Sequence, residues 1–251
     1  MTARIEVVLV RPKEDGNVGA VARLARNFGV DRLVLVAPRA SVGPEARRRS
    51  MAGLPLLKAA RRSPSLARAV AESDLVVGTT DLSTGRSSAY LRRSISPERL
   101  GELLLPVTGR VSVVFGPEDN GLSRDELAQC DLLVHIPARR EFPTLNLSHA
   151  AALVLYATHR ARGTADPETT PAPLELELNG REKELFLARM DELLARIRYP
   201  GHKRRGLILL FRRVLGRATP TEAEYRMMLG LFRSLERSLN RGEHGRKQRK
   251  R

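Results

Sequence analysis

Short apolar runs alternate with segments of helical periodicity along the first 160 residues of the chain. The runs lie at residues 5–10, 33–37, 75–78, 111–115 and 132–136, and each is nearly continuous in Val, Leu or Ile. Strands of this kind are typical of sheets that are covered on both faces. The segments 18–28, 65–73, 97–104 and 123–130 have helical patterns. This alternation predicts an α/β fold, with a parallel sheet and helices on both faces.

The remainder of the chain has a different character. Residues 163–178 are rich in Pro, Thr and acidic residues and lack an apolar period, which predicts a linker. Helical periodicity returns at 182–198, 202–215 and 221–239, and Thr221 and Glu224 form a candidate capping box. One apolar stripe of the second segment is predicted to contain Leu207, Leu210, Phe211, Val214 and Leu215. We therefore predict an α/β domain at 1–162, a linker at 163–178, a helical domain at 179–242 and a basic disordered tail at 243–251.

The net charge of +16 is concentrated near the carboxyl terminus. Residues 1–195 hold 27 Lys and Arg against 24 Asp and Glu, whereas residues 196–251 hold 17 against 4. This asymmetry indicates a polyanionic partner, of which nucleic acid is the commonest; a basic tail without a specific partner is the alternative.

Several classes of protein are excluded by composition. Cys130 is the single cysteine, so an internal disulfide framework and a Cys-based zinc site are excluded, and we expect no metal site. No apolar run approaches the roughly 18–20 residues of a membrane span, and the chain opens on "RIEVVLV" without a signal peptide. We expect a cytoplasmic protein without a membrane partner.

Three of the predicted strands are followed by unusual loops. These are "GTT" at 78–80, "GPEDNG" at 116–121 and "IPARREFPTLNLS" at 136–148. Any one of them alone reads as a turn. In open α/β sheets, however, ligands bind beyond the carboxyl ends of the strands, so three such loops at one edge predict a binding site.

Polar residues within three motifs are the candidates for chemistry. In "NVGAVARLARNFG", at 17–29, Asn17 is a candidate N-cap, and Arg23 and Arg26 point away from the apolar stripe. In "FGPEDNGLS", at 115–123, Gly116 and Gly121 suit close approach to a ligand or a positive φ. The third motif, "IPARREFPTLNLSHAAALVLYA" at 136–157, predicts a long helix beginning at Asn146 or Ser148. The face of that helix with Ala151, Leu153, Val154 and Tyr156 is predicted to be buried.

Taken together, the order and spacing of these motifs closely resemble the SpoU branch of the SPOUT RNA methyltransferases. The resemblance covers residues 1 to about 160. The helical extension "KRRGLILLFRRVLGRATPTEAEYRMMLGLFRSLER" is similar to that of tRNA ribose methyltransferases of the TrmJ type. The family implies a deep trefoil knot in the C-terminal part of the α/β domain, S-adenosylmethionine as the cofactor and a homodimer formed through the knot, with residues 150–156 as an interface. Nothing in the periodicity reveals a knot.

The resemblance also assigns roles to individual residues. The TrmJ type methylates the ribose 2′-hydroxyl at position 32 of the anticodon loop, a cytidine or uridine, so tRNA is the expected substrate and DNA is not. Arg23 would act on the 2′-hydroxyl, as a stabiliser of developing charge rather than a base. The other expected catalytic residues are Asn17, Glu118, Asn146 and Thr144, which replaces the usual Ser. The expected cofactor-binding residues are Thr79, Thr80, Gly116, Gly121, Leu122, Ile136 and Leu145. The expected RNA-binding residues are Arg26, Arg86, Arg92, Arg93, Lys203 and Arg204.

The acidic residues after the fourth strand have two interpretations. Glu118 and Asp119 either line a pocket for a sulfonium cation or position the partners of that cation. For the whole chain, the alternatives are an rRNA 2′-O-ribose methyltransferase of the same fold and a catalytically idle RNA-binding assembly factor. A dinucleotide-dependent enzyme is excluded because no Gly-x-Gly-x-x-Gly follows the first strand.

Overall fold

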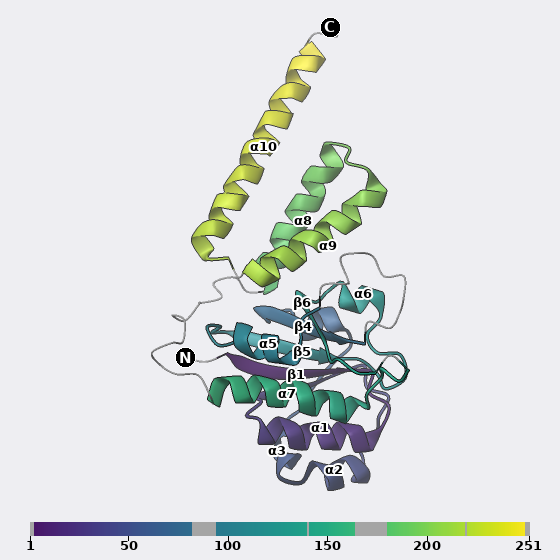
Figure 1. Cartoon of the computed structure of the whole chain (residues 1–251). Coiled ribbons are helices and arrows are strands. Elements are labelled where there is room, and N and C mark those ends of the chain that lie inside the picture. Colours follow the sequence, from purple (N-terminus) through teal and green to yellow (C-terminus); the bar gives the residue numbers. More distant parts are fainter. Residues whose placement is uncertain (1–2, 82–93, 140, 164–179, 219, 249–251) are drawn as a thin grey trace. The chain divides into compact units, whose positions relative to one another are not determined.

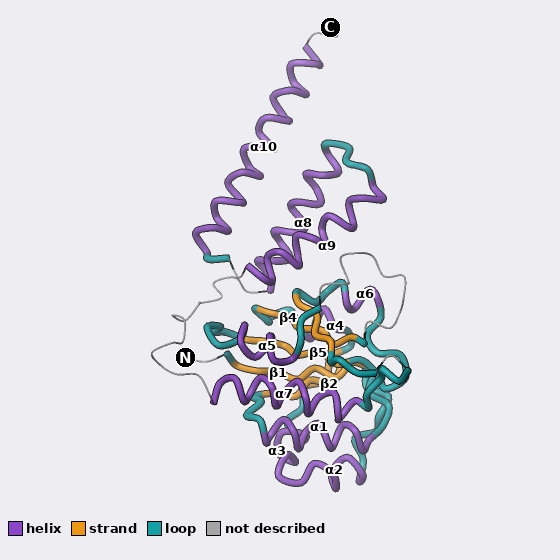
Figure 2. Tube along the Cα trace, viewed as in Figure 1, coloured by secondary structure: helices purple, strands orange, loops and turns teal. Residues whose placement is uncertain are grey.

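The computed structural model describes residues 3–81, 94–139, 141–163, 180–218 and 220–248. The chain divides into two compact units, Met1–Leu176 and Glu177–Arg251. Within the described part of the first unit, six strands form one parallel sheet in the order β3-β2-β1-β5-β4-β6 (Figures 1 and 2). The strands are β1 (Arg4–Val10), β2 (Arg32–Val36), β3 (Arg61–Ser63), β4 (Leu75–Thr80), β5 (Arg110–Phe115) and β6 (Leu132–His135).

All five predicted strands are present, within one or two residues of their predicted bounds. The additional strand, β3, lies at the edge of the sheet and has two exposed arginines and one buried residue, Ser63. It was missed because three residues with this burial pattern contain no apolar run.

Helices cover both faces of this sheet, as the sequence predicted. The helices of the first unit are α1 (Asp15–Asn27), α2 (Pro44–Ser50), the 3₁₀ turn η1 (Met51–Gly53), α3 (Leu54–Lys58), α4 (Leu66–Ala69), α5 (Pro97–Leu103), α6 (Arg124–Leu127) and α7 (Leu147–Gly163). Residues of α1, α3, α5 and α7 share one apolar core with alternate residues of the strands. Leu66, Ala69 and Leu122 belong to a second core on the opposite face, together with Val8 and Val34.

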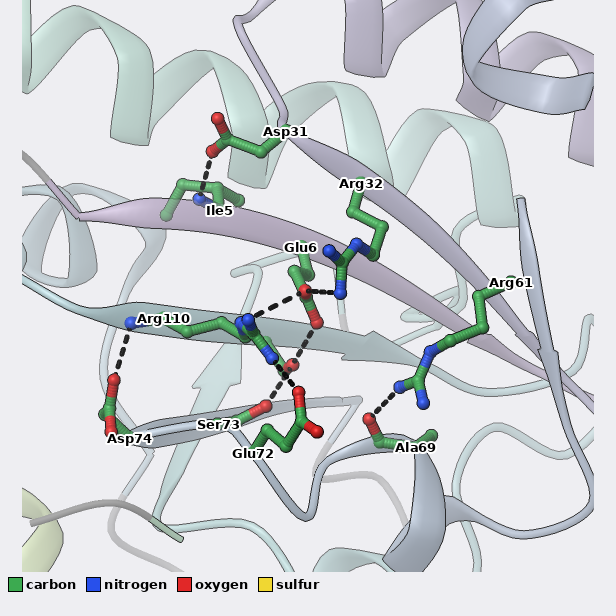
Figure 3. Close-up of polar contacts among 11 residues, drawn as sticks. Ile5, Glu6, Asp31, Arg32, Arg61, Ala69, Glu72, Ser73, Asp74 and Arg110 are labelled. Carbon is green, nitrogen blue, oxygen red and sulfur yellow. Dashed lines mark hydrogen bonds and ion pairs between the residues drawn. The ribbon is translucent and has the colours of Figure 1, made fainter. Parts of the chain in front are cut away.

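A buried polar network occupies the amino-terminal half of the sheet (Figure 3). The Glu6 side chain is 4% exposed and its carboxylate forms ion pairs with Arg32 at 3.1 Å and Arg110 at 3.4 Å. The hydroxyls of Ser73 and Ser112 lie 2.7 Å apart in the same network. A buried carboxylate needs such partners because desolvation is costly. This end of the sheet is therefore closed by internal contacts.

The second unit contains α8 (Gly180–Arg196), α9 (Gly201–Ala218) and α10 (Glu222–Gln248). Phe186 lies at the centre of their core, with its ring 4.9 Å from that of Phe232 and 5.4 Å from that of Tyr225. The capping box is confirmed, since the backbone N–H of Thr221 donates to Glu224 at 2.8 Å and the backbone N–H of Glu224 donates to the Thr221 hydroxyl at 3.3 Å.

Two predictions for this unit differ from the structure. The final helix continues to Gln248, so residues 243–248 are helical rather than part of a disordered tail. Val214, which was predicted on the apolar stripe of α9, is 40% exposed. The predicted linker at 163–178 lies almost entirely outside the described residues. In the described part of the chain, no helix combines the length and the apolar character needed to cross a membrane.

Candidate active site

A cavity of about 290 Å³ opens at the carboxyl ends of β4, β5 and β6. Its walls come from the end of β4, from the loop 116–122 after β5, from residues 136 and 143–145 before α7, and from Leu147 and Ala150 at the start of α7. The seven residues that the sequence suggested for cofactor binding all line this one cavity, as does Thr144; the seven are Thr79, Thr80, Gly116, Gly121, Leu122, Ile136 and Leu145. Three loops that are far apart in the sequence thus meet at one edge of the sheet, where α/β folds place their ligands.

The carboxylate of Glu118 connects the loop after β5 to the beginning of α1. It accepts hydrogen bonds from the backbone N–H groups of Lys13 at 3.0 Å and Glu14 at 3.2 Å, and from the side-chain amide of Asn17 at 3.0 Å. A negative charge is favourable beside the N-terminus of a helix, where unpaired N–H groups point outward. Of the two interpretations of the acidic residues, these contacts favour the one in which Glu118 holds its neighbours in position.

Asn17 was predicted to cap its helix, but it is hydrogen-bonded to both other motifs instead. The N-cap position of α1 is Glu14, and Asn17 lies inside the first turn with an exposed fraction of 8%. Its side-chain amide donates to Glu118, and its side-chain oxygen accepts from Asn146 Nδ2 at 3.1 Å. Asn17 bonds to these distant residues because the N–H donor and the oxygen acceptor of a buried amide both need partners, and Glu118 and Asn146 supply them.

Asn146 serves as the N-cap of α7, one of the two starts predicted. Its side-chain oxygen accepts from the Ser148 N–H at 2.8 Å and from the Ser148 hydroxyl at 2.7 Å. Because a carboxylate cannot donate and a backbone N–H cannot accept, the chain of bonds from Glu118 through Asn17 and Asn146 to Ser148 has only one consistent direction. The three motifs are therefore joined by one directional hydrogen-bond chain.

The two glycines of the second motif have separate reasons to be glycine. Gly121 has a φ of +60°, a conformation in which a side chain is strained. A Cβ on Gly116 would lie 2.2 Å from the carbonyl carbon of Gly121. The close approach at Gly116 is thus made by the loop itself, which folds back on the end of β5.

Two ion pairs next to the cavity were missed by the sequence analysis. Lys13 pairs with Asp119, and Arg11 pairs through both terminal guanidinium nitrogens with Glu126. Burial opposes ionisation of Glu126, but the hydrogen bonds from Arg11 and Ser123 outweigh it and lower the pKa of the carboxyl. Ser123 and Glu126 also form a complete capping box on α6. The Ser-x-x-Glu spacing is a recognisable sequence signal for that box, whereas no sequence signal identifies Arg11 as the partner of Glu126.

Other candidate residues do not line the cavity. Arg23 and Arg26 are exposed on α1, and neither belongs to the cavity wall. Lys203 and Arg204 lie on α9 in the second unit, where Arg204 forms an ion pair with Asp191 at 2.8 Å. The candidates Arg86, Arg92 and Arg93 lie outside the described residues. Within the described ranges, no three His, Cys, Asp or Glu side chains are grouped to hold a metal ion.

One face of α7 was predicted incorrectly. Ala151 and Val154 are buried, as expected, but Leu153 is 45% exposed and Tyr156 is 51% exposed. Buried and exposed positions along this helix follow the helical period, and Leu153 and Tyr156 share the outward face. This helix therefore has an exposed apolar surface, which its sequence pattern did not distinguish from its buried side.

Comparisons with known proteins agree with this geometry. Residues 4–156 match the model of the SpoU rRNA Methylase family. The tRNA (cytidine-2'-O-)-methyltransferase TrmJ of Methanocaldococcus jannaschii is 32% identical over 241 residues, which are 93% of this chain and 100% of that protein. The tRNA (cytidine/uridine/adenosine-2'-O-)-methyltransferase TrmJ of Pseudomonas aeruginosa is 31% identical over 244 residues, covering 92% and 93%. The crystal structure of TrmJ from Z. mobilis ZM4 is similar with a TM-score of 0.71 at 29% identity, covering 93% of this chain and all of that one.

Proposed function

The chain belongs to the SpoU rRNA Methylase family, and from this premise we propose that it is an S-adenosylmethionine-dependent tRNA 2′-O-ribose methyltransferase. Curated relatives that match it along almost their whole length are named as tRNA 2′-O-methyltransferases. That match includes the helical second unit, which supports tRNA over rRNA as the substrate. Within tRNA, we propose the cytidine or uridine at position 32 of the anticodon loop as the target.

The cavity suits S-adenosylmethionine, which supplies a methyl group on a sulfonium cation. Leu122 and Ile136 offer apolar walls, and Thr79 and Thr80 offer hydroxyls. Glu118 belongs to the same wall, and its carboxylate holds that wall in position through the bonds from Lys13, Glu14 and Asn17. Backbone groups of Gly116, Ile136 and Leu145 would hold the ligand, because the closed loop at Gly116 leaves backbone rather than side chains facing it.

The residues around the cavity would position the ribose and stabilise charge on its oxygen. Methyl transfer needs the 2′-oxygen in line with the methyl group, so positioning accounts for much of the rate. Arg23 is exposed, and a guanidinium keeps its proton at any ordinary pH, so its role is to stabilise the developing negative charge. Asn17, Glu118 and Asn146 fix the loops, and the Thr144 hydroxyl is available to the substrate.

We also propose the trefoil knot and a homodimer for this chain. The knot follows from membership of the family. The homodimer is supported by the outward face of α7, where Leu153 and Tyr156 leave apolar surface exposed. A dimer through this face gives Arg23, which lies outside the cavity wall of its own chain, a way to act on a ribose held at the interface. RNA contacts by Arg26, Lys203 and Arg204 belong to the same proposal.

The observation that carries the proposal is the hydrogen-bond chain from Glu118 through Asn17 to Asn146, which unites the three family motifs at one cavity. The test is methyl transfer from labelled S-adenosylmethionine to unmodified tRNA, followed by mapping of ribose methylation. We expect one mark, at position 32. A mark on rRNA alone would support the rRNA enzyme instead, and absence of cofactor binding would support the idle assembly factor.

Arg23 is tested in the same assay. Arg23→Ala should lower kcat at least about 100-fold, by analogy with the loss of one charge-stabilising donor, while cofactor affinity changes less than about twofold. Arg99→Ala, at an exposed position on α5, is the control and should retain full activity. Loss of cofactor affinity in Arg23→Ala would contradict the role given to Arg23.

A further inference from the structure

The positive charge of the first unit is concentrated in one segment. Residues 37–68 contain eight Arg or Lys and a single acidic residue, Glu45. The other residues of the first unit, 1–176, contain 16 Arg or Lys against 18 Asp or Glu, so outside this segment the net charge of the unit is negative. Solubility alone does not require basic residues to gather in this way. The segment includes α2, η1, α3 and β3, and all of it is described.

Three of these arginines follow one another on α2, which lies along the outside of α1 (Figure 1). Ala46 and Ser50 of α2 are buried, whereas Arg47, Arg48 and Arg49 are exposed. The two helices approach closely, since a Cβ on Gly19 would lie 2.2 Å from the carbonyl oxygen of Ala46. The arginines thus stand on a helix that is held firmly against α1.

The loop before α2 is also fixed to the first turn of α1. The Asp15 carboxylate accepts from the Ser41 hydroxyl at 2.7 Å and from the N–H groups of Val42 at 3.0 Å and Gly43 at 2.6 Å. These bonds fix the loop that leads into α2. The fold therefore defines where the arginines of α2 lie relative to motif one.

Arg49 connects this surface to the candidate active site. A Cβ on Gly16 would lie 2.9 Å from the guanidinium carbon of Arg49, so this side chain rests on the first turn of α1. The next residue is Asn17, which bonds to Glu118 at the cavity wall. Arg23 lies seven residues, about two helical turns, beyond Gly16 and therefore on the same side of α1. A basic path thus runs from α2 to motif one.

The internal ion pairs leave this surface positive. Glu45 accepts from Arg48 at 2.9 and 3.0 Å and from Arg49 at 2.5 Å, so its single carboxylate is shared by two guanidinium groups. The side chains of Arg48 and Arg49 are 71% and 52% exposed despite these contacts. Exposed ion pairs of this kind are weak and are easily exchanged for contacts with another anion.

We propose that Arg47, Arg48 and Arg49 form a phosphate-binding surface that holds the tRNA backbone next to the target ribose. The inference rests on the proposed function, because tRNA is the polyanion that a tRNA methyltransferase must bind. Guanidinium groups suit this partner because they contact phosphate oxygens through two parallel N–H groups. Such contacts position the RNA without reading its sequence.

A matched pair of double variants tests the proposal. Arg47→Gln/Arg48→Gln removes two charges from the surface and spares Arg49, which touches motif one. Arg4→Gln/Arg99→Gln removes two exposed charges elsewhere, and Arg99 pairs with Glu102 three residues on, as Arg48 does with Glu45. Binding of an unmodified tRNA transcript is measured by fluorescence anisotropy at several salt concentrations, and kcat and KM are measured with the same transcript.

We expect the α2 double variant to raise Kd and KM for tRNA roughly tenfold, with kcat within about twofold of the wild type. The slope of log Kd against log salt concentration should be smaller than that of the wild type by about 1.4 to 1.8. This is the loss of two phosphate contacts, each of which contributes about 0.7 to 0.9. The control variant should change none of these by more than about twofold. Equal values for the two variants would overturn the proposal.

Glu45→Gln provides a change of opposite sign. Removing the carboxylate that partly neutralises Arg48 and Arg49 should tighten tRNA binding about two- to fivefold. Weaker or unchanged binding would count against the surface.

If the wild type binds tRNA but transfers no methyl group, the proposed function fails, while a difference between the double variants still supports the surface. If the wild type does not bind tRNA, both proposals fail.

Discussion

Asn17 joins the three motifs of the candidate active site, although it is not among the residues that line the cavity. Its amide is buried and bonded at both ends, to Glu118 and to Asn146, which lie 101 and 129 residues away in the sequence. Buried hydrogen bonds of this kind contribute most when every member is satisfied, because each unpaired group carries the full cost of desolvation. The position of the loop after β5 relative to the start of α7 therefore depends on this one side chain.

Asn17→Ala should lower the free energy of unfolding by about 1–3 kcal/mol, because it removes two hydrogen bonds and takes away the acceptor of Asn146 Nδ2. Asn146→Ala breaks one of the same bonds. In a double-mutant cycle measured by urea unfolding, we expect the two effects to deviate from additivity by at least about 0.5 kcal/mol. Strict additivity would show that the two amides are not coupled.

Gly116→Ala should deform the loop after β5, because the added Cβ would overlap the carbonyl carbon of Gly121. We expect the affinity for S-adenosylmethionine, measured by calorimetry, to fall at least about tenfold. Gly121→Ala is the matched variant, since its Cβ would meet open space and the cost is limited to about 1 kcal/mol of backbone strain at φ +60°. Equal affinity in the wild type and Gly116→Ala would contradict this account of the loop.

At the scale of elements, α6 is anchored to the beginning of the loop before α1 by the pair of Arg11 and Glu126. The Glu126 side chain is 11% exposed and also caps α6 through Ser123. Since its folded pKa lies below the ordinary value of 4.5, its ionised form stabilises the fold above about pH 4.5. That contribution is lost as the pH falls through the folded pKa.

Glu126→Gln should therefore destabilise the protein by about 1–3 kcal/mol at pH 7, where the wild-type carboxylate is ionised and paired. The difference between variant and wild type should shrink as the pH falls below 4.5. Urea unfolding followed by circular dichroism at pH 7, 5, 4 and 3 measures this difference, with Asp125→Asn at the exposed neighbouring position as the control. A difference that stays constant down to pH 3 would exclude Glu126 as its source.

The elements that could be predicted from sequence are those whose local pattern agrees with their environment. Apolar runs identified β1, β2, β4 and β5, because interior strands of a parallel sheet are covered on both faces. They also identified the edge strand β6, three of whose four residues are buried. The arginine-rich α2 and the short β3 have no such pattern, and they owe their structure to packing against α1 and β2.

The candidate site was predictable to a similar extent. Loop positions followed from the rule that carboxyl ends of strands meet at one edge, and the family motifs supplied the residues. The partners of Asn17 could not be predicted. The local sequence suggests an N-cap, and it contains no information on hydrogen bonds to residues that are more than 100 positions away. For the same reason, the exposed side of α7 could not be distinguished from its buried side by composition alone.

At the scale of the molecule, the sheet has two chemically distinct ends. The amino-terminal half is closed by the network around Glu6, Arg32 and Arg110 (Figure 3), whereas the carboxyl ends open into the cavity. The closed end provides stability, and the open end retains loops whose backbone can face a ligand. The basic surface on α2 joins the open end through motif one.

The proposed homodimer leads to a measurement on the whole molecule. In sedimentation equilibrium, the wild type should have about twice the chain mass of 27.9 kDa. Leu153→Ser/Tyr156→Ser removes the exposed apolar pair and should sediment as a monomer, while Met51→Ser, at a residue that is 62% exposed, should remain dimeric. A dimer that survives the double substitution would place the interface elsewhere.

The claim that three separated loops together form the site of the methyl donor is tested most directly by a crystal structure with S-adenosylhomocysteine, the demethylated form of the cofactor. We predict that the ligand lies in the cavity between Thr79, Gly116 and Leu145, with the bonds of Asn17 to Glu118 and Asn146 intact. A ligand bound away from this cavity, or in contact with only one of the loops, would contradict the account.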